Sequence, residues 1–330
     1  MTESWKTAFL LLGLATLAAC SGEKPKTAGR LTLAVVPKGT THEFWKSVHA
    51  GARQAARELD VDIIWKGPLK EDDREAQIAV IEDFISRGVD GIVLAPLDDT
   101  ALRTPVMDAI RGGIPVVIFD SDLKGDRHAS FVATDNIEGG RKAGDHLAAL
   151  LNGNGRVAML RYAEGSASTM NREQGFLEAI ARHDGITVVS ANQYGGATTE
   201  TAYRASENLL APLKQPDGAL ALDGLFCPNE STTFGMLRAL QEAGLAGKVR
   251  FVGFDSSPKL VEALENGQLH GLVLQNPVNM GYLAVKTLVH HLCGQAVPAR
   301  VDTGSTLVTR DNRNEPAIQA LLAPDLSELP

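Results

Sequence analysis

Short apolar runs alternate with amphipathic stretches along most of the chain. Residues 31–36 form a continuous apolar run, which is typical of a strand buried on both faces. From residue 44 onward, apolar residues recur at spacings of three and four, which predicts a helix with one buried face. Further strands are predicted at 61–65, 91–95, 114–120, 129–133, 156–161, 186–190, 218–222, 249–254 and 270–274. Further helices are predicted at 74–87, 100–111, 137–151, 171–182, 199–211, 231–243, 258–265 and 278–292.

This regular alternation of strand and helix predicts the fold class. Strands that are joined by helices pair in parallel, and the helices cover both faces of the sheet. The number of units exceeds one comfortable sheet, so an α/β protein with two doubly wound parallel-sheet lobes is expected. Ligands of such sheets bind beyond the carboxyl ends of the strands.

The amino terminus has the pattern of a secretion signal. One lysine, Lys6, precedes an apolar stretch at 7–17 that is too short to span a membrane. The stretch ends in Leu-Ala-Ala before Cys20, and this pattern resembles bacterial lipoprotein signals, in which the cysteine is lipidated. Residues 1–19 are therefore expected to be a lipoprotein signal peptide and 20–30 a polar tether. A plain secretory signal with an accidental cysteine is the alternative.

Composition narrows the class of function. The 330 residues carry a formal net charge of −8, the sign opposite to that of most nucleic-acid binders. Three cysteines exclude a disulfide scaffold, and Cys227 and Cys293 are expected to be unpaired, although an oxidising destination would permit a bridge. The eight histidines show no metal-ligand spacing, and neither a phosphate-binding loop nor a nucleophile elbow occurs. We expect no enzyme activity, no cofactor and no metal.

Polar and aromatic residues gather where the predicted strands end. A sugar needs carboxylates and amides for its hydroxyls, an arginine for its oxygens and aromatic rings for its apolar faces. Candidate ligand-binding residues of these types are Phe44, Trp45, Asp120, Asn136, Arg172, Tyr194, Asn229, Asp255 and Gln275.

Seven segments, in order, resemble the ribose-binding-protein-like family of periplasmic substrate-binding proteins, the sugar receptors of ABC importers. The segments lie at 41–52, 114–120, 135–140, 172–176, 229–235, 252–255 and 274–277. The resemblance implies the type I periplasmic binding protein fold, with two lobes joined by a multi-strand hinge. It implies an N-terminal lobe of 31–134 plus 276–303, a C-terminal lobe of 135–275 plus 304–320, and a tail at 321–330.

The resemblance also assigns roles to the candidate residues. Phe44 and Trp45 match the aromatic pair that sandwiches the sugar, and the polar candidates match the family's ligand contacts. His42, Ala95 and Ser121 depart from the ribose-binding pattern, which makes ribose itself a doubtful ligand, and His42 joins the candidates.

Structural roles remain open alternatives for several candidates. The aromatic pair could start a helix core, Tyr194 could be a wall residue, and Gln275 could satisfy hinge backbone. Helix capping is the alternative for Asp120, Asn229 and Asp255, and Asp135 is expected to be a cap or turn residue. Surface pairing with Glu164 or Glu173 is the alternative for Arg172.

These observations predict a lipid-anchored solute-binding protein of an ABC importer, located in the periplasm or cell envelope. It would bind a monosaccharide or similar polyhydroxylated ligand by hinge closure, as a monomer, with the permease and ATPase as separate chains. The alternative is a sensor of a sugar or furanosyl signal that passes its closed form to a chemoreceptor or histidine kinase. A repressor of the lactose class would need a helix-turn-helix before the first strand, where a signal and tether stand instead.

Overall fold

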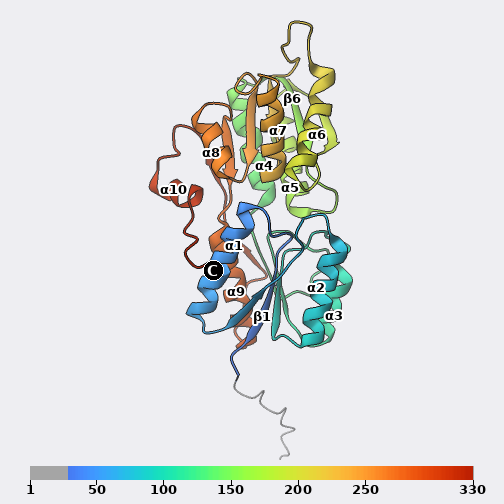
Figure 1. Ribbon diagram of the computed structural model, residues 1–330, viewed down its shortest axis with the longest axis vertical. Coiled ribbons are helices and arrows are strands. Elements are labelled where there is room, and N and C mark those ends of the chain that lie inside the picture. Colours follow the sequence, from blue (N-terminus) through green and yellow to red (C-terminus); the bar gives the residue numbers. More distant parts are fainter. Residues whose placement is uncertain (1–28, 330) are drawn as a thin grey trace, which may run out of the picture. The chain divides into compact units, whose positions relative to one another are not determined.

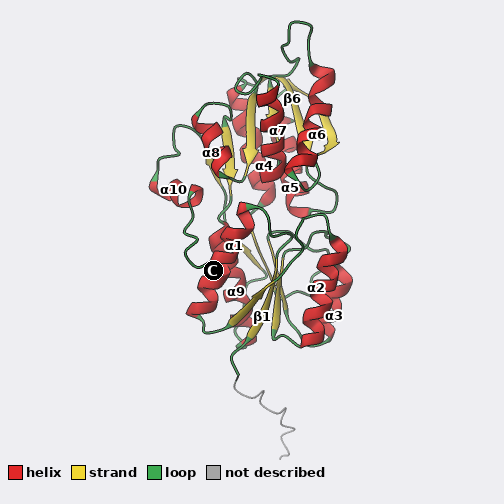
Figure 2. Ribbon diagram, in the orientation of Figure 1, coloured by secondary structure: helices red, strands yellow, loops and turns green. Residues whose placement is uncertain are grey.

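The computed structural model describes residues 29–329. The expected signal peptide, the expected lipidation site Cys20 and most of the expected tether lie outside the described residues. Figures 1 and 2 show two sheets, each layered between helices. The predicted fold class, α/β with two doubly wound sheets, is confirmed.

The first sheet has six strands in the order β11-β5-β4-β3-β1-β2, and every neighbouring pair is parallel. Its strands are β1 (Thr32–Val36), β2 (Asp62–Trp65), β3 (Gly91–Leu94), β4 (Val116–Phe119), β5 (Ser130–Ala133) and β11 (Arg300–Asp302). It is covered by α1 (Glu43–Glu58), α2 (Arg74–Arg87), α3 (Arg103–Arg111) and α9 (Pro277–Leu292). In Figure 1, α1 and α9 lie on one side of this sheet and α2 and α3 on the other. We call this unit the first lobe.

The second sheet has the corresponding order β12-β10-β9-β8-β6-β7, with β12 antiparallel to β10. Its strands are β6 (Asn154–Arg161), β7 (Gly185–Tyr194), β8 (Gly224–Phe226), β9 (Arg250–Phe254), β10 (Gly271–Leu274) and β12 (Thr306–Val308). Its helices are α4 (Asn136–Leu150), α5 (Ala167–Ile180), α6 (Thr199–Leu210), α7 (Glu230–Glu242), α8 (Pro258–Glu265) and α10 (Pro316–Leu322), with a 3-10 turn at Ala211–Leu213. We call this unit the second lobe.

Each sheet is buried on both faces because most positions of its central strands are apolar. In β1, Leu33 and Val35 join the core on one face, and Ala34 and Val36 join the core on the other. The second lobe repeats this arrangement with two further core clusters on the two faces of its sheet. Continuous apolar strands of this kind are typical of parallel sheets.

Two helix pairs pack unusually closely, one in each lobe. Gly51 on α1 lies against the backbone of Val278 on α9, and Gly140 on α4 lies against the carbonyl oxygen of Arg172 on α5. A Cβ atom at either glycine would overlap that facing backbone. The absence of a side chain at Gly140 therefore allows α5 to approach α4 and sets the position of Arg172.

The chain passes between the lobes three times, after β5, after β10 and between β11 and β12. The crossing after β5 is hydrogen-bonded to the crossing between β11 and β12. The backbone N–H of Asp135 donates to Asp302 Oδ1 at 3.0 Å, and Thr134 Oγ1 donates to the carbonyl oxygen of Gly304 at 3.2 Å. Adjacent crossing strands of this kind can act as a hinge, because a few residues absorb the change in backbone angles.

Most predicted elements are found, with shifts at their ends. The strand predicted at 218–222 is wrong: the chain turns at Gly218, which has φ of 83°, and the strand is β8 at Gly224–Phe226. β7 continues to Tyr194, four residues beyond its predicted end, and α5 begins at Ala167 instead of 171. β11, β12 and α10 were not predicted, because the first two are three-residue strands and neither is continuously apolar.

Candidate functional site

The carboxyl ends of strands from both sheets surround a small polar cavity. The cavity measures about 30 Å³, which is enough for about two water molecules. It is lined by Lys38, His42, Phe44, Trp45, Glu71, Asp120, Tyr162, Ser168, Thr169, Arg172, Asn229, Glu230, Asp255 and Gln275.

On the first-lobe side, a buried ion pair joins Lys38 and Asp120. Lys38 follows β1, Asp120 follows β4, and their charged atoms are 3.0 Å apart. Asp120 has φ of 60°, in the left-handed region that non-glycine residues rarely adopt. Such backbone strain persists where the surrounding structure fixes it, and it is common at binding sites.

A second buried group on this side is centred on Glu71. Its carboxylate lies 2.8 Å from His42 Nδ1, accepts a hydrogen bond from Trp45 Nε1 at 2.5 Å, and accepts another from the hydroxyl of Tyr162 at 2.6 Å. Burial alone would lower the pKa of His42, but the adjacent Glu71 carboxylate outweighs it and raises that pKa to about 9. Burial alone would raise the pKa of Glu71, but His42 and Lys38 outweigh it and lower that pKa to about 2. At neutral pH the two side chains form a charged pair.

On the second-lobe side, Arg172 is held by four partners. Its guanidinium donates to Asn136 Oδ1 at 2.7 Å and to the carbonyl oxygen of Pro228 at 3.0 Å. One nitrogen lies 3.7 Å from Asp255 Oδ2, and the group stacks 4.0 Å from the centre of the Phe254 ring. All four partners belong to the second lobe, so this lobe alone fixes the guanidinium.

Asp255 and Gln275 complete this side of the cavity. Gln275 Nε2 donates to Asp255 Oδ1 at 2.8 Å, and the backbone N–H of Glu230 donates to Asp255 Oδ2 at 3.3 Å. Asp255 repeats the strained backbone of Asp120, with φ of 63°. Burial raises the pKa of Asp255, and Arg172 offsets part of that rise. Burial also raises the pKa of Glu230, to about 7.

One acceptor in this cavity has no partner. Within residues 29–329, Gln275 Oε1 is the only buried side-chain nitrogen or oxygen without a hydrogen bond. Leaving a buried acceptor unpaired costs about 1–3 kcal/mol. A ligand that donates a hydrogen bond there would remove that cost.

The two sides of the cavity are bonded directly to each other. Lys38 Nζ donates to Ser168 Oγ at 2.9 Å, and the backbone N–H of Ser168 donates to Ser121 Oγ at 3.1 Å. The backbone N–H of Asp99 donates to the carbonyl oxygen of Gly165 at 2.9 Å. The structure is therefore a closed arrangement of the two lobes.

Most of the expected ligand-binding residues line this cavity. Those that do so are His42, Phe44, Trp45, Asp120, Arg172, Asn229, Asp255 and Gln275. Asn136 lies behind the cavity, where it accepts the hydrogen bond from Arg172. Tyr194 ends β7 outside the cavity, with 38% of its surface exposed and its ring 5.4 Å from the Arg161 guanidinium.

The alternatives left open by the sequence have mixed outcomes. Asn229 does cap α7, where it accepts from the N–H of Thr232, and it also lines the cavity. Asp135 caps α4, as expected. Asp255 is not a cap, since Ser257 caps α8. Surface pairing of Arg172 with an adjacent glutamate is wrong, because Arg172 is buried.

Lys38, Glu71, Tyr162 and Glu230 are cavity residues that the sequence reasoning did not choose. Lys38 and Tyr162 stand within two residues of a strand end. They could therefore have been predicted, because the other candidates are also polar or aromatic residues that follow strands. Glu71 lies in the loop after β2, and nothing in its sequence surroundings marks it.

Residues 29–329 also bear on metal binding, membrane insertion and the state of two cysteines. In residues 29–329, no group of three or more histidine, cysteine or acidic residues is placed to hold a metal ion. No helix in the described part of the chain is long and apolar enough to cross a membrane. Cys227 is buried, Cys293 is exposed, and both are free thiols.

Two α/β lobes with a polar cavity at their facing strand ends are the architecture of a ligand-binding protein. The profile of the periplasmic binding protein domain matches residues 33–296. The ribose import binding protein of Haemophilus influenzae is 30% identical over 295 residues, which cover 89% of this chain and 94% of that protein.

Solved structures agree with this match. The periplasmic component of an ABC-type sugar transport system from Hahella chejuensis is 37% identical, with a TM-score of 0.80 over 84% of this chain and 99% of that one. A carbohydrate transporter solute-binding protein from Agrobacterium radiobacter, in complex with D-arabinose, is 33% identical, with a TM-score of 0.84 over 90% of this chain and 100% of that one. The chain belongs to the periplasmic binding protein family, and its fold is type I. This is a family of solute-binding proteins, not of enzymes.

Proposed function

We propose that this protein is the solute-binding component of an ABC importer and binds a monosaccharide or similar polyhydroxylated ligand between its lobes. Its relatives support the class of ligand, since they include a ribose import protein and a protein that holds D-arabinose. The permease and ATPase are separate chains in this proposal, and the protein acts as a monomer.

The cavity lining carries the proposal. The unpaired Gln275 Oε1 stands beside the Asp255 carboxylate and the fixed Arg172 guanidinium, which together offer acceptors and donors to hydroxyl groups. Phe44 and Trp45 lie in the same lining and offer apolar surface to the C–H face of a sugar ring. A purely apolar ligand would leave these buried polar groups without partners.

Closure follows from the division of the site between two lobes. A ligand that docks on one lobe still has hydroxyl groups without hydrogen-bond partners. These groups gain partners only when the other lobe closes over the ligand. The ligand therefore binds the closed form more tightly and shifts the open–closed equilibrium toward it. In this closed structure the cavity holds only about two water molecules, which is too little for a sugar ring. The side chains that line it, or the two lobes, must therefore move apart to admit the ring.

The proposal keeps the domain limits expected from the sequence. The N-terminal lobe comprises 31–134 with 276–303, the C-terminal lobe comprises 135–275 with 304–320, and residues 321–330 form the tail. The assignment of β11 to the first sheet and β12 to the second supports the division near residue 303. The lining residues of the cavity, which include Lys38, Glu71, Tyr162 and Glu230, are the proposed ligand site.

Isothermal titration calorimetry with sugars tests the site. A thermal-shift screen of D-ribose, D-arabinose, D-allose and D-fucose first selects a sugar. Asp120→Ala and Arg172→Ala should then each weaken its binding by about 2–4 kcal/mol, because each leaves buried polar partners unpaired. Arg182→Ala removes an exposed ion pair with Asp145 on the second lobe and serves as the matched control. Unchanged affinity in both cavity variants would reject the site.

A lipid anchor at Cys20 and a place in the cell envelope are part of the same proposal. Several acyl chains on one residue hold a protein firmly at a membrane. Cys20→Ser should therefore move the protein from the membrane fraction to the soluble fraction. A variant that still sediments with membranes would show that the cysteine is not the anchor.

A further inference from the structure

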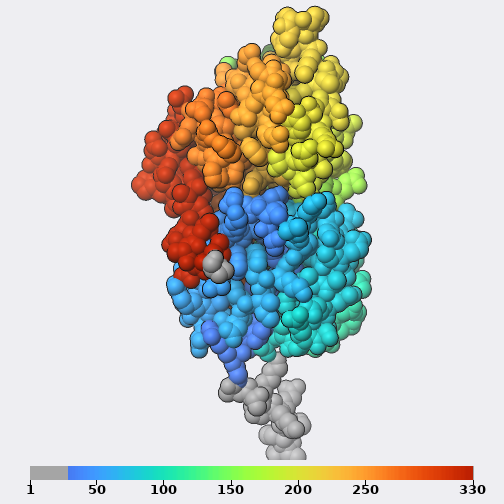
Figure 3. All heavy atoms as spheres, in the orientation of Figure 1, coloured from blue at the N-terminus to red at the C-terminus, as the bar shows by residue number. Residues whose placement is uncertain are grey.

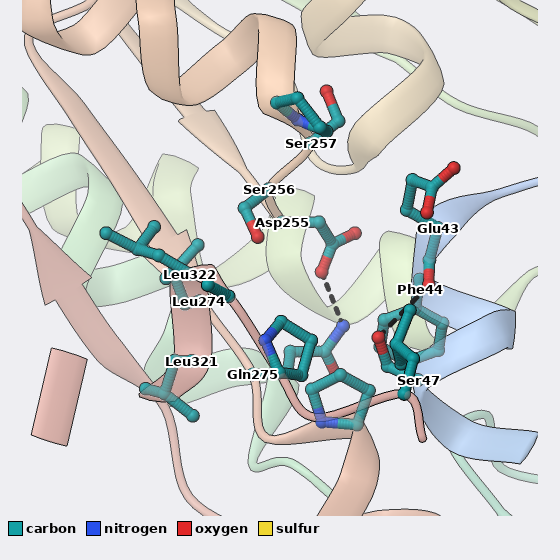
Figure 4. Close-up of a pocket in the computed structure, with 15 residues that line it drawn as sticks. Glu43, Phe44, Ser47, Asp255, Ser256, Ser257, Leu274, Gln275, Leu321 and Leu322 are labelled. Atoms are coloured by element: carbon teal, nitrogen blue, oxygen red, sulfur yellow. Dashed lines mark hydrogen bonds between the residues drawn. The ribbon is translucent and has the colours of Figure 1, made fainter. Parts of the chain in front are cut away.

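A second, larger cavity adjoins the proposed sugar site. It measures about 260 Å³, and Phe44, Asp255 and Gln275 line both cavities. Figure 4 shows Asp255 and Gln275, joined by their hydrogen bond, between α1 on one side and Leu321 and Leu322 on the other. The side chains that bind the proposed ligand therefore also form one wall of this second cavity.

The opposite wall is supplied by the C-terminal segment, residues 316–329. Ile318 of α10 is buried in the core of the second lobe. The chain then passes to the first lobe, where Glu328 forms an ion pair with Arg57 of α1 at 2.5 Å. In Figure 3 this segment, coloured red, lies against both the orange part of the second lobe and blue residues of the first. The segment covers the cavity without filling it.

This cavity differs in chemistry from the sugar site. The C-terminal segment contributes Leu321, Leu322, Pro324 and Leu326 to its lining, and Leu274 adds another apolar side chain. A free sugar presents hydroxyl groups around its rim, outside the C–H faces of its ring, and gains little from an apolar wall at that rim. An apolar group that leaves water for such a surface gains free energy in proportion to the apolar area that is buried.

We propose that this cavity is a subsite for an apolar substituent of the bound sugar, so that the ligand class includes glycosides with an alkyl or aryl group. The inference rests on the proposed function, because the sugar ring must occupy the adjoining polar cavity. Phe44, Asp255 and Gln275 separate the two cavities, so a substituent on the ring position that faces them enters the second cavity where these side chains move apart. The C-terminal segment then acts as a specificity-determining wall.

Calorimetry with matched glycosides tests the subsite. The sugar selected by the thermal-shift screen is compared with its methyl and phenyl glycosides in both anomers. We expect one phenyl glycoside to bind at least tenfold more tightly than its methyl counterpart, because only the phenyl group is large enough to cover the apolar wall. Leu326→Gln should remove most of that difference and change the affinity for the free sugar less than twofold.

Glu328→Ala is the matched control, since Glu328 lies on the same segment, pairs with Arg57 and does not line the cavity. It should keep the preference for the phenyl glycoside. If the free sugar binds and both phenyl anomers are rejected, the subsite is wrong and the proposed function stands. A phenyl preference that survives Leu326→Gln also overturns it. If neither sugars nor glycosides bind, both proposals fail.

Discussion

The two sides of the polar cavity differ in where their hydrogen-bond partners come from. Arg172, on the second-lobe side, takes every partner from its own lobe. On the first-lobe side, Lys38 and Glu71 have partners in their own lobe, Asp120 and His42, and also bond to the other lobe. Lys38 donates to Ser166 and Ser168, and Glu71 accepts from Tyr162. The Arg172 guanidinium is therefore fixed by its own lobe, whereas Lys38 and Glu71 gain further hydrogen bonds when the lobes close.

This difference indicates an order of events. A preorganised surface binds a ligand with little further loss of side-chain freedom, so the ligand should dock first on the second lobe. The first lobe then adds its contacts as the hinge closes. Substitutions on the second-lobe side should abolish docking, whereas those on the first-lobe side should weaken closure.

Arg172→Ala should have the largest effect. It leaves Asp255 buried without its cation, so the free energy of unfolding should fall by about 3 kcal/mol. Binding of the selected sugar should weaken by about 100-fold or more. Urea denaturation and calorimetry measure the two effects. If this variant binds sugar normally, the second-lobe side is not the docking surface.

Glu71→Gln should have a smaller effect, mainly on closure. It weakens the contacts to His42 and Tyr162, so we expect sugar affinity to fall about tenfold. Tyr162→Phe is the matched variant, because it removes only the hydrogen bond between the lobes. The two effects should be strongly non-additive in a double-mutant cycle measured by calorimetry. Additive losses would show that the bond does not couple the lobes.

The pH dependence of stability should also come from the first-lobe side. His42 has its pKa raised from 6.5 to about 9, so its contribution is full below pH 6.5 and is lost as the pH rises through 9. Glu71 has its pKa lowered to about 2, so its contribution is full above pH 4.5 and is lost as the pH falls toward 2. Between pH 6.5 and 9, the free energy of unfolding of the unsubstituted protein should fall by about 2 kcal/mol more than that of His42→Asn. Chemical denaturation across that range provides the comparison, and parallel curves would contradict the charged pair.

Burial of Glu230 should make the free energy of unfolding depend on pH in a second, lower pH range. Its pKa is raised from 4.5 to about 7, so the folded state holds a proton that the unfolded state has lost. The free energy of unfolding should therefore fall between pH 4.5 and 7, and Glu230→Gln should flatten that interval. An unchanged slope in the variant would place the titration on another group.

Tyr194→Ala should have the smallest effect. The side chain is partly exposed at the end of β7 and does not line the cavity. We expect the affinity for sugar to change less than twofold, measured beside Arg172→Ala under the same conditions. A loss of tenfold or more would extend the site beyond the cavity.

The sequence predicts the layered fold well because buried parallel strands and amphipathic helices are local patterns. The helices at 74–87 and 258–265 agree with α2 and α8 at both ends. The pairing of Glu71 with Tyr162 could not be predicted, because it joins residues 91 positions apart on different lobes. The short strands β11 and β12 were missed for a similar reason, since the neighbouring strands β5 and β10 hold them in place.

The central claim is that the two lobes close around a sugar. Spin labels at Leu69→Cys in the first lobe and Val188→Cys in the second, in a Cys20→Ser, Cys293→Ser background, allow the distance between the lobes to be measured by double electron–electron resonance. Both labelled positions are exposed, and the remaining Cys227 is buried. Saturating sugar should convert a broad or longer distance distribution into one narrow, shorter distribution, and Arg172→Ala should prevent that change. An unchanged distribution in the presence of a sugar that calorimetry shows to be bound would contradict the account.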